Sequence, residues 1–156
     1  MDQAFINQAV GLAAENVAAG GKPFGAVIVA NGSVIATGIN EAAQTGDLTA
    51  HAEIQAMRQA AQNGNAHLLK GAVMYASGHP CPMCLAAMHL AGFSKIFYDT
   101  PLEAVEGTSL DVKEVYAQMQ KPFSEQSIPL VQLKASTGEQ PVQQWLQQQG
   151  EDHNAK

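Results

Sequence analysis

The chain has few charged residues, and few of those are basic. Asp, Glu, Lys and Arg make up 14% of its 156 residues, against about a quarter in average proteins. The 8 Lys and Arg face 14 Asp and Glu, for a formal net charge of −6, and no two basic residues are adjacent. Proteins that follow a nucleic-acid backbone need clustered Lys and Arg to neutralise phosphates. The composition therefore argues against a nucleic-acid partner and favours a small-molecule substrate.

Long apolar runs are missing as well. No stretch of about 18 apolar residues is present, so we expect no membrane-spanning helix. Residues 1–21 have apolar residues at helical spacing and lack the basic start of a secretion signal, which predicts a helix of the mature protein and a cytoplasmic location. The length fits one domain on a prior of roughly 150 residues each. We expect that domain at 1–150 and a polar tail at 151–156.

Cysteine is scarce, and its two occurrences, Cys81 and Cys84, lie within GHPCPMC. In a reducing compartment such a pair is more often a metal or redox site than a disulfide. Pro82 is typical of the first position of a helix, so both thiols should lie on one face at a helix start, where the helix dipole lowers thiol pKa. A catalytic zinc takes three protein ligands and keeps one position open. The pair therefore supplies at most two ligands of such a site.

His51 is the candidate for the third ligand. It begins a second predicted helix, and in α/β folds helix starts lie beyond the carboxyl ends of strands, where His51 can meet the thiols. Glu53 does not share a helix face with His51, so it is a poor ligand but can act as an acid and base. The alternative is a structural zinc or redox motif in a binding module, which leaves the pairing of His51 with Glu53 unexplained.

The remaining patterns predict an α/β fold. Two apolar runs around Asn31-Gly32 are typical of a β-hairpin, and a strand, a helix and a strand in succession predict parallel pairing. We expect a three-layer α/β/α sandwich with a five-stranded mixed sheet. The expected strands are 24–30, 33–40, 71–77, 94–100 and 127–135, the expected helices after the first are 51–64, 82–92, 109–119 and 140–150, and 41–50 is expected to be a loop.

The motifs HAEIQA and PCPMC form the H-x-E and P-C-x-x-C signature of zinc-dependent deaminases. With GKPFGAVIV and ATGIN, they make the chain resemble the cytidine and deoxycytidylate deaminase superfamily, from the first helix to the helix of Trp145. Within it, the chain is most similar to bacterial guanine deaminases. The resemblance implies a cytidine deaminase-like fold, Zn²⁺ on His51, Cys81 and Cys84, and Glu53 as the catalytic acid and base. The implied reaction is hydrolytic deamination of a free nucleobase, with guanine giving xanthine and ammonia.

The resemblance also implies substrate contacts. Phe24 matches the residue whose ring stacks on the base. Asn40 matches the asparagine whose amide forms hydrogen bonds to the base. Asp111 matches an acidic residue that accepts hydrogen bonds from the N–H groups of a purine. Backbone N–H groups at Ala52 and Cys81 would donate to the reaction intermediate. Each side chain also has a plainer interpretation: Phe24 as a core residue, Asn40 as a turn residue and Asp111 as a helix cap.

Two departures from the family pattern bear on the substrate. His79 stands where relatives commonly have Glu or Ser. We expect it to help orient the zinc ligands without binding the metal itself. No aromatic residue follows Trp145, although guanine deaminases often close the pocket with one from the partner subunit. Cytosine, another aminopurine or an amino-triazine therefore stays open as the substrate, as does a transfer-RNA adenosine. The resemblance further implies a homodimer and allows exchange of the C-terminal helix between subunits.

Overall fold

A computed structural model describes residues 1–150, and their contacts divide into two units. The first unit, Met1–Gln120, contains the whole β-sheet, and the second begins at Lys121. The expected polar tail at 151–156 lies outside the described residues. A single domain over 1–150 stays a prediction. None of the helices in the described residues is long and apolar enough to cross a membrane.

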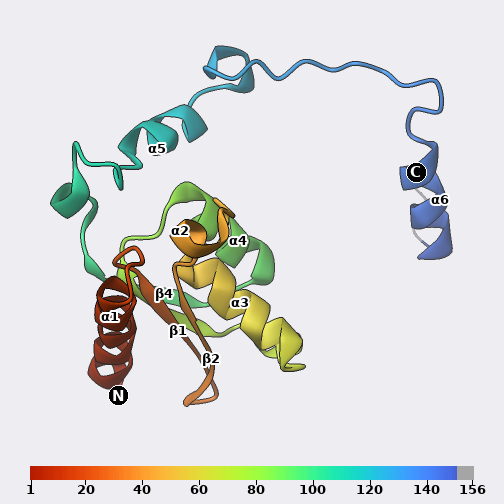
Figure 1. The fold of residues 1–156 in the computed structure, drawn as a ribbon. Helices are drawn as coiled ribbons and strands as arrows, with labels where there is room; N and C mark the ends of the chain where they lie inside the picture. The colour runs from red at the N-terminus through yellow and green to blue at the C-terminus, as the bar shows by residue number, and fades with distance from the viewer. Residues whose placement is uncertain (151–156) are drawn as a thin grey trace. The chain divides into compact units, whose positions relative to one another are not determined.

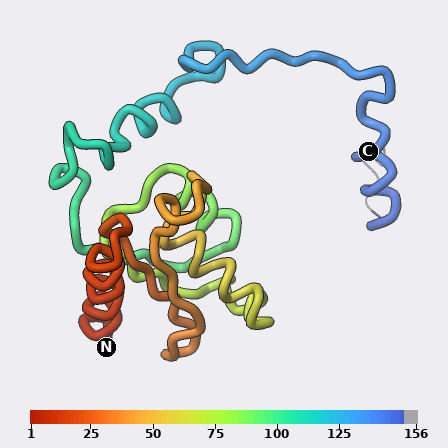
Figure 2. Tube along the Cα trace, in the orientation of Figure 1, coloured from red at the N-terminus to blue at the C-terminus, as the bar shows by residue number. Residues whose placement is uncertain are grey.

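The sheet has four strands in the order β2-β1-β3-β4 (Figure 1). β1 is antiparallel to both β2 and β3, whereas β3 and β4 are parallel. Asn31 and Gly32, with φ of 52° and 77°, form the turn that brings β2 back alongside β1 (Figure 2). The hairpin and the parallel pair are therefore confirmed. The strands are β1 (Gly25–Ala30), β2 (Ser33–Ile39), β3 (Val73–Gly78) and β4 (Lys95–Thr100).

Helices cover both faces of this sheet, as Figure 1 shows. β1 is buried along its whole length, so its alternate side chains enter two cores. Val27 and Val29 pack with Ala9 of α1 (Asp2–Ala18), while Ala26 and Ile28 face the core that contains residues of α3 (Ala52–Gln62) and α4 (Pro82–Ala91). The three-layer arrangement is confirmed.

The start of α3 lies directly on β2. A Cβ added to Gly38 of β2 would come 2.2 Å from the carbonyl oxygen of Ala52, a distance that no side chain tolerates. Glycine at this position therefore lets the helix backbone touch the strand. As a result, His51, the residue before the helix, is held against the end of the sheet.

The prediction of a fifth strand at 127–135 is wrong. This segment has no regular structure and forms no ladder with any of residues 1–150. Its large apolar side chains are exposed, Leu133 at 93% and Ile128 at 80%. An apolar, β-branched pattern shows that a segment needs burial, but a strand forms only where a neighbouring edge accepts its backbone hydrogen bonds. The segment belongs to the second unit, whereas the sheet lies in the first.

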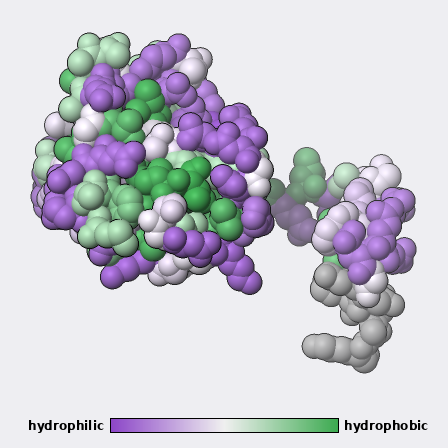
Figure 3. Space-filling model, turned by 90° about the horizontal axis from the view of Figure 1, so that it is seen from below, coloured by the Kyte–Doolittle hydropathy of each residue, from purple (hydrophilic) through white to green (hydrophobic). Residues whose placement is uncertain are grey.

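The remaining elements are short helices. α2 forms within the expected loop at 41–50, and α5 begins four residues later than the predicted helix at 109–119. Figure 3 shows hydrophobic residues gathered on the visible face of the larger body, with hydrophilic ones around them. The additional helices are α2 (Ala42–Thr45), η1 (Ala66–Leu68), η2 (Leu102–Val105), α5 (Lys113–Met119), η3 (Phe123–Glu125) and α6 (Gln140–Gln148).

Candidate active site

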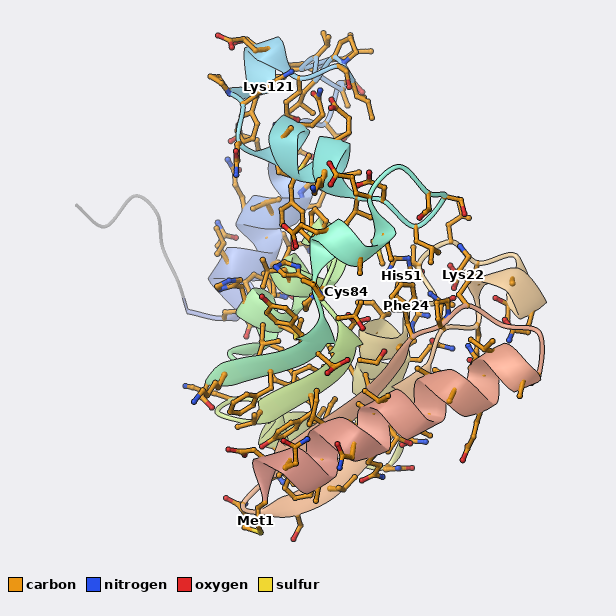
Figure 4. The ribbon with its side chains drawn as sticks, turned by 90° about the vertical axis from the view of Figure 1, so that its left-hand side faces the viewer. Met1, Lys22, Phe24, His51, Cys84 and Lys121 are labelled. Carbon is orange, nitrogen blue, oxygen red and sulfur yellow. The ribbon has the colours of Figure 1, made fainter. Side chains whose placement is uncertain are left out.

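The three predicted metal ligands meet at one end of the sheet. His51 is the N-cap residue of α3, Cys81 is the N-cap residue of α4, and Cys84 lies in the first turn of α4. His51 Nδ1 is 3.4 Å from Cys81 Sγ and 3.6 Å from Cys84 Sγ, and all three ligand atoms lie within 4.8 Å of one another. Figure 4 shows His51 and Cys84 side by side, with Phe24 next to them.

These distances fit a tetrahedral zinc site. Zinc bonds of about 2.3 Å to sulfur and about 2.0 Å to nitrogen place the two ligand atoms roughly 3.5 Å apart at a tetrahedral angle. The observed separations of 3.4 and 3.6 Å match this value. Both cysteines are free thiols, so no disulfide competes for the sulfur atoms. Zinc bound here supplies a Lewis acid that makes water reactive near neutral pH.

The pKa values of the two thiols are shifted in opposite directions. The hydrogen bond from the Cys84 thiol lowers the pKa of Cys81 to about 4, and the same interaction raises the pKa of Cys84. The backbone N–H of Cys84 donates to Cys81 Sγ at 3.4 Å, as expected at a helix start. The hydrogen bond to Cys81 raises the pKa of His51. Of the three ligand groups, Cys81 is therefore the one whose thiolate form is favoured.

Glu53 stands beside the ligands in a buried position. Only 7% of it is exposed, and it lines the same cavity as His51 and Cys81. Burial raises the pKa of its carboxyl group, since a charged carboxylate loses its hydration there. A carboxyl group beside a reactive centre can take up a proton and release it again. Its position and its chemistry suit an acid and base.

The cavity next to these groups has a volume of about 140 Å³, and Phe24 and Asn40 line its wall. Asn40 is 2% exposed, and its Oδ1 accepts a hydrogen bond from the backbone N–H of Ala42 at 3.1 Å. The Nδ2 group is therefore what Asn40 can offer to a ligand. Ala52 is fully buried between His51 and Glu53, and its N–H lies in the first helical turn, where no intrahelical acceptor exists.

Asp111 does not line the cavity, although its neighbours Leu110 and Val112 do. Its two carboxylate oxygens accept hydrogen bonds from the backbone N–H groups of Gly107, at 2.8 Å, and Lys113, at 2.9 Å. These two bonds lower the pKa of Asp111. The geometry favours the capping alternative, because the carboxylate holds together the loop before α5.

His79 supports the loop that carries Cys81. Its Nδ1 lies 2.9 Å from the carbonyl oxygen of Pro80, and because a carbonyl only accepts, Nδ1 carries the hydrogen. The hydroxyl of Tyr116 donates to the same oxygen. The His79 ring also meets Tyr98 and Tyr116 edge-on, at 4.8 and 5.8 Å between centroids. The peptide before Cys81 is thus held by two donors.

Sequence reasoning missed several residues around the site. Tyr116 belongs to no motif, and the apolar lining residues Leu102 and Leu110 come from segments without a recognisable signature. Lys22 lies in the motif GKPFGAVIV, but the motif gave it no role. For Tyr116, the one available signal was an aromatic residue on a short predicted helix. These residues reach the site through the tertiary fold rather than through local spacing.

A sequence profile of the cytidine and deoxycytidylate deaminase zinc-binding region matches residues 1–100. The chain belongs to this deaminase family. Membership makes it an enzyme, a zinc-dependent aminohydrolase, and explains why His51, Cys81 and Glu53 converge within the matched region. A binding module with a structural zinc is not needed to account for the motif.

Comparison with individual proteins shows which members of the family this chain is similar to. The chain is 39% identical to the guanine deaminase of Bacillus subtilis (strain 168) over 144 residues, 92% of each protein. A crystal structure of Bacillus subtilis guanine deaminase matches with a TM-score of 0.84 and 37% identity, covering 99% of this chain and 96% of that one. A protein solved in complex with 2,6-diaminopurine matches with a TM-score of 0.64 and 26% identity, over 71% of this chain and 62% of that one.

Replacement of His51 tests the ligand set. We expect purified protein to hold about one zinc per chain, and His51→Ala to lose zinc to a chelator that leaves the native protein loaded, because two thiolates alone complete only half of a tetrahedral site. Metal analysis after dialysis against the chelator measures this loss. His67→Ala, at an exposed position in η1, is the matched control and should keep its zinc. Equal zinc retention in His51→Ala would remove His51 from the ligand set.

Proposed function

We propose that this deaminase acts on guanine, adding water and releasing xanthine and ammonia. The observation that carries the proposal is the likeness to a guanine deaminase over 92% of both chains, well beyond the zinc motifs. The relative solved with 2,6-diaminopurine supports a purine-sized ligand. The cavity supplies an aromatic ring, an amide and a buried carboxyl group beside the zinc ligands. We place the enzyme in the cytoplasm, where thiols remain reduced.

In the proposed mechanism, the purine stacks on Phe24 and accepts a hydrogen bond from Asn40 Nδ2. Glu53 takes one proton from the attacking water and passes it to a ring nitrogen. It then takes the second proton, from the hydroxyl group of the tetrahedral intermediate, and delivers it to the departing amine as the carbonyl forms. The N–H groups of Ala52 and Cys81 donate to the oxygen as charge develops on it. One water is consumed and one ammonia leaves, so Glu53 ends the cycle as it began.

A different aminated heterocycle is the second candidate. It is favoured by the position of Asp111, which does not line the cavity and whose two oxygens accept hydrogen bonds from N–H groups of its own loop. Cytosine, another aminopurine and an amino-triazine belong to this group. An RNA substrate is less well supported, because the chain carries a net charge of −6 and has no basic cluster.

We further propose a homodimer in which the second unit of one subunit packs against the other copy, with exchange of α6 as one form of this packing. The support is the exposure of the unit's large apolar side chains, among them Leu130, Val131, Leu133 and Trp145, each at least 55% exposed. Several large apolar side chains exposed within one unit are typical of a surface that another protein chain covers.

Ammonia release from a panel of free bases tests the substrate. We expect guanine to give the highest kcat/KM among guanine, adenine, cytosine, 2,6-diaminopurine and an amino-triazine, because it matches the relative that covers nearly the whole chain. A coupled ammonia assay at equal zinc loading measures all five. Faster turnover of another heterocycle would transfer the assignment to that compound, and turnover of none would refute the proposal.

Glu53→Gln separates proton transfer from metal binding. The amide has nearly the same shape as the carboxyl group but cannot carry protons, so we expect zinc content to stay and kcat to fall by roughly 10²-fold or more. Single-turnover assays with metal analysis on the same sample measure both. Glu15→Gln, an exposed carboxyl group on α1, is the control. Full activity in Glu53→Gln would take this residue out of the reaction.

The dimer is tested by mass in solution. Analytical ultracentrifugation should give about twice the 16.4 kDa of one chain, and Leu133→Glu should shift the protein toward the monomer, because it places a charge in a packed apolar contact. Val34→Glu, on an exposed position of β2 in the first unit, serves as the control. A wild-type protein that sediments as a monomer at micromolar concentration would refute this arrangement.

A further inference from the structure

Asn16 is a buried polar residue on α1 that the zinc chemistry does not use. It is 2% exposed, and its side-chain amide satisfies both of its ends. Nδ2 donates to the carbonyl oxygen of Lys22 at 2.7 Å and to that of Asn40 at 2.8 Å. Oδ1 accepts from Gln44 Nε2 at 3.2 Å. One side chain thus joins α1, the turn before β1, the end of β2 and α2.

The two carbonyl groups that Asn16 holds belong to the backbone that presents the base-facing side chains. Lys22 lies two residues before Phe24, and Asn40 itself lines the cavity. The N–H of Asn40 donates to the carbonyl oxygen of Phe24 at 3.1 Å, so these two wall residues are directly linked. Asn16 holds the backbone of this linked pair through its hydrogen bonds to Lys22 and Asn40, and it does not itself line the cavity.

The amide has little freedom to move. A Cβ added to Gly21 would lie 2.4 Å from Asn16 Oδ1, so the turn is packed directly on the amide. Within residues 1–150, Asn16 supplies the hydrogen bond to the carbonyl oxygen of Asn40. Loss of this donor would leave a buried carbonyl group unpaired, and a shift of the Asn40 backbone toward water would be the cheapest relief.

We propose that Asn16 is a positioning residue for base recognition, which sets the spacing between the Phe24 ring and the Asn40 amide. The proposal rests on the proposed function in that Phe24 and Asn40 are taken to bind the base. Asn16 makes no hydrogen bond to His51, Glu53, Cys81 or Cys84. Its effect should therefore fall on substrate binding rather than on zinc or proton transfer.

Asn16→Asp tests this role. The substitution keeps the shape but turns an oxygen toward two carbonyl oxygens, so both hydrogen bonds are replaced by repulsion. We expect KM for the base to rise by about tenfold or more, while zinc content and kcat at saturation stay within about twofold. Asn7→Asp, an exposed position on the same helix, adds the same charge and is the matched control.

Two outcomes overturn the proposal: an unchanged KM in Asn16→Asp, or a fall in kcat together with loss of zinc, which would mark a residue needed only for folding. If Asn16→Asp does not fold, Asn16→Ala removes the donors without adding charge, and the same KM, kcat and zinc measurements decide. KM is measured for whichever base the wild-type protein turns over fastest. If guanine is not the base turned over fastest, only the substrate assignment is refuted. An unchanged KM in Asn16→Asp refutes the role of Asn16. A wild-type protein that turns over no base contradicts both proposals.

Discussion

The site depends on the shared direction of two strands. β2 and β3 are both antiparallel to β1, so they run the same way, and the helices that follow them begin at the same edge of the sheet. α3 follows β2 and begins after His51, and α4 follows β3 and begins after Cys81. Residues 30 positions apart in the chain are brought within hydrogen-bonding distance by this topology. Helix starts also offer unpaired N–H groups, which stabilise thiolate charge.

The same edge of the sheet divides the cavity into two halves with different origins. The chemical half comes from the helix starts, which hold the ligands, Glu53 and the N–H group of Ala52. The second half comes from the segments that precede β1 and follow β2, which present Phe24 and Asn40. Asn16 holds the backbone of the second half through hydrogen bonds to the carbonyl groups of Lys22 and Asn40. His79 holds the backbone of the first half through a hydrogen bond to the carbonyl group of Pro80. Side-chain donors that fix the backbone are thus a feature of both halves.

The sequence predicted what local spacing determines. Cys81 and Cys84 share a helical turn, and His51 and Glu53 lie at the start of a helix, so these positions followed from spacings of a few residues. The hairpin around Asn31 followed from turn chemistry in the same way. The strand at 127–135 was wrong because an apolar pattern reports a need for burial but not the presence of a sheet edge that can pair with it.

Long-range polar contacts escaped prediction for a related reason. Asn16 and Asn40 are 24 residues apart, and Tyr116 and Pro80 are 36 apart. Neither pair has a spacing that any helix or strand rule can detect. A signal did exist for Asn16, because it continues the buried face of α1 after Ala9 and Ala13. A polar residue at a buried helical position needs a partner, and the sequence alone does not name it.

The residues that line the cavity also divide along the chain. The zinc ligands, Glu53, Phe24 and Asn40 all lie within residues 1–100, the region that the family profile matches. The rest of the wall includes Leu102, Leu110 and Val112, which lie beyond that region. The zinc motifs therefore lie within the region that the family profile matches, whereas the cavity wall is completed by residues of the loop before α5. Asp111 lies in this loop and holds its backbone through the N–H groups of Gly107 and Lys113, so it is linked to the cavity only through its neighbours Leu110 and Val112.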